Sequence, residues 1–215
     1  MTRFIYLHGF ASGPQSTKAR AFKQAFALRG LPLQVPDLEG GDFQNLTLSS
    51  QMKILDRCLD DSPEPAALIG SSMGGYLAAL AAERRPEVVG LYLMAPGFNF
   101  LKRWGERHNI AVGNFNSIPP LIQVFHYRYN SDKSLSSKIF SDAEAWAEIS
   151  FARKIPIRIV HGIHDETVDI RESREFAKLR SWVEFEEIDS DHGLASHVDW
   201  VTTDGMAFFH RSGFF

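Results

Sequence analysis

Three residues with the chemistry of a nucleophile, a base and an acid lie in three short motifs of the sequence. Ser72 is the third residue of GSSMG at positions 70–74, which fits the pattern G-x-S-x-G. Asp165 lies in a G-x-x-D-x-x-V segment that begins at Gly162, and His192 precedes a glycine near the end of the chain. A histidine that accepts the proton of a serine hydroxyl, and is itself oriented by an aspartate, makes that serine a nucleophile toward acyl carbons. We therefore predict that Ser72 attacks, His192 transfers the proton and Asp165 orients the imidazolium.

Four neighbouring residues offer alternatives for these roles. Ser71 has a hydroxyl, but it lacks glycines two positions before and after it. Glu166 and Asp169 share a loop with the predicted acid, but both come later in that loop, and Asp169 is placed to begin a helix. His197 is expected at the start of the last helix, which makes it the weaker candidate for the base.

A fourth motif, HGF at positions 8–10, could supply the groups that stabilise a developing negative charge. The backbone N–H of Phe10 can join the backbone N–H of Met73 as a two-donor oxyanion hole. His8 and His161 end expected strands, and we interpret both as structural. No cofactor is expected for this chemistry.

A metal site is the competing interpretation of the histidines. His161 and His164 are three residues apart and Asp165 directly follows His164, while Asp191 and His192 are adjacent in a second loop. Two histidines in a loop lack the helical spacing of H-E-x-x-H, and a metal leaves the serine motif unexplained. We therefore predict no metal.

The elements that must position these residues alternate between strands and helices. Alternation implies crossover connections, so we predict an α/β fold with a mainly parallel six-stranded sheet and helices on both faces. The candidate catalytic residues all follow strands, and would meet at the carboxyl edge of the sheet. The expected strands are Phe4–Leu7, Leu33–Val35, Ala66–Ile69, Val88–Met94, Ile157–Val160 and Val183–Ile188, and the expected helices start after Ser16 and cover Leu48–Leu59, Ala78–Arg84, Ile170–Leu179 and Val198–Phe209.

The alternation fails once, between Met94 and Ile157, where the sequence indicates no strand. We predict that residues 97–146 form a small lid that is rich in aromatic residues and lies within a single domain, residues 1–215. Its rings could line a substrate pocket or fill a core of the lid's own. The lid also carries more basic than acidic residues, which could attract an anionic substrate such as an acyl thioester of coenzyme A, although a solvated surface explains the same charges. The aromatic residues are Phe98, Phe100, Trp104, Phe115, Phe125, Tyr127, Tyr129, Phe140 and Trp146, of which Phe98, Phe100, Trp104 and Phe125 are the pocket candidates, and the basic residues are Lys102, Arg103, Arg107, Arg128, Lys133 and Lys138.

Composition excludes several classes of protein. The chain has 215 residues, of which 44% are hydrophobic, so it can bury a sizeable core. Its formal net charge of -3 does not suit a nucleic-acid binder. Cys58 is the only cysteine, so no internal disulfide can form. We find neither a signal sequence nor an apolar run long enough to span a membrane, and expect a cytoplasmic protein of undetermined oligomeric state.

These motifs together resemble the α/β-hydrolase superfamily, and more narrowly the small bacterial YqiA-like esterases. The superfamily likeness rests on GSSMGG and on the chain order serine, aspartate, histidine. The narrower likeness rests on HGFASGPQSTKA near the start, with GIHDETV and DSDHG further on. The resemblance covers essentially the whole chain and implies a sheet without the two leading strands of the full superfamily. Met73 stands where leucine is more usual, which matters little because only its backbone N–H is needed.

The sequence as a whole predicts a serine carboxylic-ester hydrolase that acts on small to medium acyl esters through an acyl-enzyme intermediate. An acyl thioesterase is the nearest alternative, because the same three residues serve either leaving group. An alternative of another class is a ligand-binding module that keeps the fold without turnover.

Overall fold

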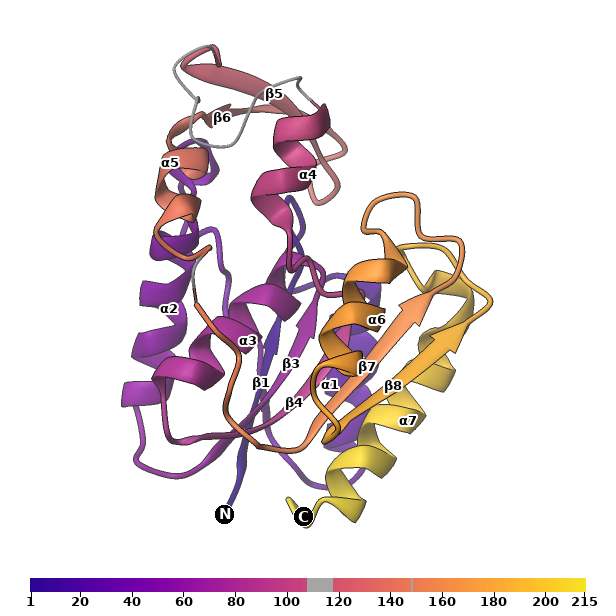
Figure 1. Cartoon of the computed structure of the whole chain (residues 1–215). Coiled ribbons are helices and arrows are strands. Elements are labelled where there is room, and N and C mark those ends of the chain that lie inside the picture. Colours follow the sequence, from indigo (N-terminus) through magenta and orange to yellow (C-terminus); the bar gives the residue numbers. More distant parts are fainter. Residues whose placement is uncertain (108–117, 148) are drawn as a thin grey trace.

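A parallel sheet of six strands, in the order β2-β1-β3-β4-β7-β8, forms the centre of the structure (Figure 1). The computed structural model describes residues 1–107, 118–147 and 149–215. Because the strands are parallel, their carboxyl ends meet at one edge of the sheet, where open α/β folds bind ligands. The strands are β1 (Arg3–Leu7), β2 (Leu33–Gln34), β3 (Ala66–Ser71), β4 (Val88–Met94), β7 (Ile157–Gly162) and β8 (Val183–Ile188).

Helices cover both faces of the sheet, as the alternation predicts. Successive residues of β1 point to opposite faces, so Phe4 and Tyr6 pack in one buried cluster while Ile5 and Leu7 pack in the other. Within the described ranges, no helix has both the length and the apolar character needed to cross a bilayer. The helices are α1 (Thr17–Ala27) and α7 (Val198–Arg211) on the first face, and α2 (Leu48–Asp60), α3 (Met73–Arg84) and α6 (Ile170–Lys178) on the second.

Helix caps and pairing set the ends of these elements. Ser16 caps α1 by accepting a hydrogen bond from the N–H of Ala19, and Thr47 forms a capping box at the start of α2. The predicted α/β fold class is confirmed, with small shifts in the strand ends. The sequence predicted that the third strand ends at Ile69, but β3 continues to Ser71 because its last two residues pair with β4.

The segment between β4 and β7 contains two strands, so the expectation of none was wrong. β5 (Leu121–His126) and β6 (Ser131–Ser136) form an antiparallel hairpin that is separate from the main sheet. Five of the six residues of β6 are polar, and only Leu135 is apolar and fully buried. Hydrophobic periodicity cannot reveal a strand that buries a single apolar side chain.

The hairpin, α4 (Phe100–Arg107) and α5 (Lys138–Glu144) form a cap over the carboxyl edge of the sheet, at the end opposite to both termini (Figure 1). We use the word cap for the described residues between 97 and 146. The cap is tied to the body through the hairpin turn, where Tyr127 N–H donates to Ala11 O at 2.9 Å and Arg128 pairs with Asp37 at 2.7 Å. One wall of the carboxyl edge is therefore built by the cap.

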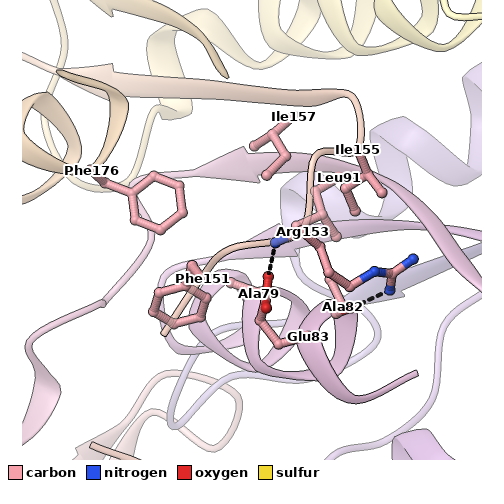
Figure 2. Close-up of a pocket in the computed structure, with 9 residues that line it drawn as sticks. All are labelled: Ala79, Ala82, Glu83, Leu91, Phe151, Arg153, Ile155, Ile157 and Phe176. Carbon is pink, nitrogen blue, oxygen red and sulfur yellow. Dashed lines mark hydrogen bonds between the residues drawn. The ribbon is translucent and has the colours of Figure 1, made fainter. Parts of the chain in front are cut away.

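The chain returns from the cap to β7 along α3, beside a small cavity whose lining residues are drawn in Figure 2. The volume of this cavity is about 10 Å³. Arg153 fixes this segment: its N–H donates to Glu83 at 2.9 Å, and its guanidinium donates to Ala82 O. A cavity of this size holds about one water molecule. It is a packing gap beside the return segment, lined by Ala79, Ala82, Glu83, Leu91, Phe151, Arg153, Ile155, Ile157 and Phe176.

Candidate active site

Ser72 lies at a sharp turn between β3 and α3, at the carboxyl edge of the sheet. Its backbone has φ 53° and ψ -118°, a conformation that L-amino acids rarely adopt. The neighbouring chain holds this turn in place: Ser72 N–H donates to Met94 O, and Ser72 O accepts from the N–H groups of Gly75 and Gly97. The turn presents Ser72 to a cleft above the sheet.

The glycines around Ser72 are required by close backbone contacts. A Cβ on Gly74 would lie 2.2 Å from Leu7 O, and a Cβ on Gly70 would lie 2.5 Å from Gly74 O. Neither contact involves a flexible side chain that could move aside. The G-x-S-x-G pattern therefore reflects how tightly the start of α3 packs against β1 at Gly74 and against the end of β3 at Gly70.

A hydrogen-bonded chain joins the three residues predicted to do the chemistry. Ser72 Oγ lies 3.1 Å from His192 Nε2, and His192 Nδ1 lies 2.7 Å from Asp165 Oδ2. A carboxylate can only accept, so His192 Nδ1 carries the hydrogen and Nε2 is left to accept from the serine hydroxyl. This tautomer is the one that a general base at Ser72 needs.

The side chain of Asp165 is fully buried, and its two oxygens have different partners. Oδ1 accepts from the N–H groups of Thr167 and Val168, while Oδ2 accepts from His192 and from His161 Nε2 at 3.0 Å. Burial on its own would raise the pKa of Asp165, but the hydrogen bonds from His161, His192 and the backbone outweigh it and hold the pKa well below the usual range. Asp165 is therefore a charged acceptor throughout the neutral pH range.

His161 has a role that the sequence did not predict. We interpreted it as structural, but its Nε2 faces Asp165 Oδ2 and the carbonyl oxygen of Val168, both at 3.0 Å, so Nε2 must carry a hydrogen. Its Nδ1 lies 2.8 Å from Ser173 Oγ in α6. His161 thus helps to orient Asp165 by donating to the same carboxylate oxygen as His192 does, and only its position just before Gly162 could have indicated this.

Replacing His161 with leucine should weaken both the fold and the proposed chemistry. We expect the free energy of unfolding to fall by about 1–3 kcal/mol, because Asp165 loses a donor and Ser173 loses its partner. We expect kcat to fall about 10-fold, because the remaining contacts orient Asp165 less firmly. Urea unfolding at neutral pH and ester hydrolysis measure the two effects.

The matched control is Ser173→Ala, which also breaks a bond to His161 but leaves both histidine donors on Asp165. It should lower stability with little change in kcat. The difference in free energy of unfolding between wild type and His161→Leu should be largest above about pH 4, the usual aspartate pKa. It should shrink as the pH falls toward the lower pKa of folded Asp165. Equal losses of kcat in the two variants would refute a specific role for His161.

His8 orients the loop that contains Phe10. Its Nε2 accepts from Leu38 N–H at 3.0 Å, so Nδ1 carries the hydrogen and donates to Gly9 O at 3.0 Å. Burial lowers the pKa of His8, which favours this neutral ring. In a planar trans peptide the N–H points opposite to the C=O, so holding Gly9 O turns the N–H of Phe10 away from His8.

Two backbone donors remain available beside the nucleophile. A Cβ on Gly9 would lie 3.5 Å from Ser72 Cβ, which places the loop at residues 8–10 next to the serine. Met73 begins α3, and a Cβ on Gly97 would lie 3.7 Å from Met73 N. In the part of the chain that the structure describes, neither Phe10 N–H nor Met73 N–H donates a hydrogen bond. Both residues line the cleft.

The cleft above Ser72 has a volume of about 740 Å³, which suits a small-molecule ligand. Its two sides differ in chemistry. The cap side is mainly apolar, with Phe100, Trp104, Ile122, Val124 and Phe125 beside Phe10 from the loop after β1, although Arg103 and Gln123 also line it. The side formed by the start of α1 and the loops after β7 and β8 is mostly polar, with Ser12, Ser16, Thr17, Lys18, Glu166, Thr167 and His192.

Three of the four rings predicted for a pocket line this cleft: Phe100, Trp104 and Phe125. Phe98 does not; it stacks on Phe176 with ring centroids 4.2 Å apart. Tyr127 lines the cleft although it was not among the pocket candidates. Phe115 lies outside the described residues. Several other aromatic rings of the cap fill space or lie at the surface of the cap. Some of the aromatic residues of the cap therefore line a pocket, as predicted, and others serve only packing or lie exposed.

Pairing with carboxylates reduces the basic excess of the cap. Arg103 donates to both oxygens of Glu172 at 2.6 Å, and Arg128 pairs with Asp37. Lys133 is exposed and lies over the ring of Tyr129. Because two of the basic side chains are already paired, the cap offers less charge to an anionic substrate than its composition suggests.

The alternative residues lie apart from the hydrogen-bonded chain. Ser71 is a buried residue that ends β3, and Asp169 caps α6 by accepting from Arg171 N–H. His197 begins α7 and contacts Ser196. The metal alternative needs His161 and His164 together, but His164 pairs with Asp189 at the surface. Among the described residues, no three His, Cys, Asp or Glu side chains are grouped to hold a metal ion.

Comparison with known proteins gives one match to a family. Residues 3–203 match the family described as "Uncharacterised protein family (UPF0227)". Among curated proteins, the chain is 27% identical over 194 residues to "Palmitoyl-protein thioesterase ABHD10, mitochondrial" from Homo sapiens, and equally to the protein of that name from Pongo abelii. These matches cover 80% of this chain, and the chain spans 60% of the length of those relatives.

Solved structures share the fold at low sequence identity. Est1E from Butyrivibrio proteoclasticus, solved with ferulic acid bound, superposes with a TM-score of 0.82 at 20% identity over 99% of this chain and 89% of its own. Alpha/beta hydrolase domain-containing protein 10 from mouse superposes with a TM-score of 0.81 at 21% identity over 97% of this chain and 89% of its own. Both likenesses agree with the architecture described above.

Proposed function

Because the chain belongs to the family UPF0227 and has the α/β-hydrolase fold, we propose that it is a serine hydrolase that cleaves acyl esters. One observation carries the proposal: the hydrogen-bonded chain from Ser72 Oγ through His192 to the buried carboxylate of Asp165, at the base of a cleft. In such an arrangement the histidine can remove the serine proton while the aspartate stabilises the charge that forms on the ring.

The proposed reaction has two stages. His192 Nε2 takes the proton of Ser72 as Oγ attacks the acyl carbonyl carbon, and a tetrahedral intermediate forms. His192 then gives the proton to the leaving oxygen or sulfur, which departs and leaves the acyl group on Ser72. Water, deprotonated by His192, attacks this acyl-enzyme and releases the carboxylic acid with the serine restored.

The oxyanion of each tetrahedral intermediate needs two donors, and we assign these to the backbone N–H groups of Phe10 and Met73. Their freedom from other hydrogen bonds in the described chain supports the assignment, as does the hold of His8 on the preceding carbonyl. Each such donor contributes about 3 kcal/mol to stabilising a transition state.

The two sides of the cleft suggest how the substrate lies. His192 must protonate the leaving group, so the leaving group belongs on the polar side of the cleft, next to His192. The acyl group then faces the cap, where Phe100, Trp104 and Phe125 can bury a small to medium acyl chain.

An acyl thioesterase is the second candidate function, because the curated relatives are named as palmitoyl-protein thioesterases. The catalytic residues would be the same, because a thiolate is a better leaving group than an alkoxide and needs no further residue to depart from the tetrahedral intermediate. The same name includes the word mitochondrial, so the cytoplasmic location stays a prediction from sequence alone.

The test uses matched pairs of substrates with the wild-type protein. p-Nitrophenyl esters and S-phenyl thioesters with acyl chains of two to sixteen carbons are compared by kcat/KM, and a fluorophosphonate probe reports the nucleophile. We expect turnover of esters with a maximum at short or medium chains. Thioester turnover without ester turnover would support the second candidate, and neither turnover nor labelling would favour a ligand-binding module.

A further inference from the structure

Lys18 lies in the first turn of α1, within the HGFASGPQSTKA segment, and the proposed reaction does not use it. Its ammonium group donates a hydrogen bond to Gly193 O at 2.7 Å, and both residues lie on the polar side of the cleft. Gly193 directly follows His192, so a residue near the start of the chain contacts the loop that contains the proposed base, 175 positions away.

The main chain around His192 has few other supports. The loop after β8 is fixed at its two ends, by Ser190 O accepting from His164 N–H and by Leu194 N–H donating to Asp191. Within the described ranges, the bond from Lys18 is the single hydrogen bond made by the main chain of His192 and Gly193. A charged donor on a carbonyl makes a stronger bond than a neutral donor does.

The groups around Lys18 are mostly acidic, which favours a hydrogen bond from the ammonium group to Gly193 O over the binding of an anionic ligand. The titratable groups that face it are Asp165 and Glu166 from the loop after β7, and Asp191 and His192 from the loop after β8. No carboxylate of the described chain lies within ion-pair distance of Lys18. Burial lowers the pKa of Lys18 to about 8, although Asp191 and Asp165 favour its charged form.

We propose that Lys18 is a positioning residue, which fixes the main chain beside His192 and so keeps the imidazole within reach of Ser72. The role rests on the proposed function. It also explains why a lysine is present in a turn that faces several carboxylates without pairing with any of them. Loss of the bond would let His192 move, and a displacement of about 1 Å in a catalytic group can cost about 100-fold in rate.

The test compares Lys18→Met, which removes the donor at similar length, with Lys18→Arg, which keeps a charged donor. Lys23→Met is the control, because Lys23 is an exposed lysine of the same helix. We expect kcat for a p-nitrophenyl ester to fall about 10- to 100-fold in Lys18→Met with KM changed less than about 3-fold. We expect Lys18→Arg to recover part of the loss and Lys23→Met to match wild type.

Two further measurements separate positioning from general stability. The kcat of wild type should decline as the pH rises through about 8, where Lys18 loses its proton, and Lys18→Met should lack this decline. Hydrogen exchange of the peptide covering residues 189–197 should be faster in Lys18→Met, whether or not substrate is present.

Several outcomes would overturn the inference. A wild-type kcat in Lys18→Met would show that the bond is dispensable, and a change confined to KM would make Lys18 a substrate contact instead. Equal losses in Lys18→Met and Lys18→Arg, with lowered thermal unfolding midpoints, would indicate a purely structural lysine. Absence of any ester or thioester turnover in wild type would overturn the proposed function itself. The results for the Lys18 variants concern only the role of Lys18 and would leave the proposed function in place.

Discussion

Ser72→Ala should abolish both ester turnover and labelling by a fluorophosphonate probe. The variant lacks the only oxygen that lies within hydrogen-bond reach of His192 Nε2 among the described side chains, so no acyl-enzyme can form. Loss of the serine in a triad lowers kcat by about 10⁶-fold, with a residual rate from binding and oxyanion stabilisation. Hydrolysis of a p-nitrophenyl ester, followed with gel fluorescence of the labelled protein, measures both effects.

The Ser72→Ala variant should fold as the wild-type protein does, so a loss of turnover would not result from unfolding. Ser72 owes its turn to main-chain bonds with Met94, Gly75 and Gly97, which alanine can also make. Ser71→Ala is the matched control, because it removes the neighbouring hydroxyl but leaves Ser72 facing His192, and labelling should persist. Undiminished turnover in Ser72→Ala would sink the assignment of the nucleophile, and labelling lost only in Ser71→Ala would transfer the role to Ser71.

Asp165→Asn should lower kcat by about 10⁴-fold while leaving the protein folded. The reason is the direction of the amide. Thr167 and Val168 donate to Oδ1, so the amide oxygen of the variant takes that position and its NH₂ group takes the place of Oδ2. This NH₂ faces His192 Nδ1, which must then act as an acceptor, so Nε2 carries the hydrogen and cannot accept one from Ser72.

Asparagine at position 165 also removes a negative charge that the wild-type protein keeps at neutral pH. Asp165 is held charged in wild type because hydrogen bonds outweigh burial and keep its pKa below the usual range, so acid conditions are needed to protonate it. Asp169→Asn is the matched control, since asparagine also caps a helix and Asp169 lies outside the hydrogen-bonded chain. A loss of kcat as large in Asp169→Asn as in Asp165→Asn would mean that the wrong acid was assigned.

Local pattern alone located most of the fold and the three central residues. Most strands of the main sheet are short apolar runs, whereas β8 alternates apolar residues with glutamates. A residue that closely follows such a strand lies at the carboxyl edge of a parallel sheet. Ser72, Asp165 and His192 therefore converge whatever the details of the helices. The second strand of the cap hairpin escaped prediction because β6 buries one apolar side chain, Leu135, and so lacks a periodic signal.

The sequence by itself determined the α/β class, the position of the serine turn and the order of the candidate catalytic residues. Each of these follows from short segments of the chain and needs no knowledge of how distant segments pack. Only the tertiary structure decided that His161 supports Asp165, that Lys18 bonds the main chain at Gly193, and that Phe98 packs against Phe176 instead of lining the cleft. These contacts depend on how loops from distant strands are oriented when the helices pack. Side-chain direction is set by that packing, and no local pattern of residue types encodes it.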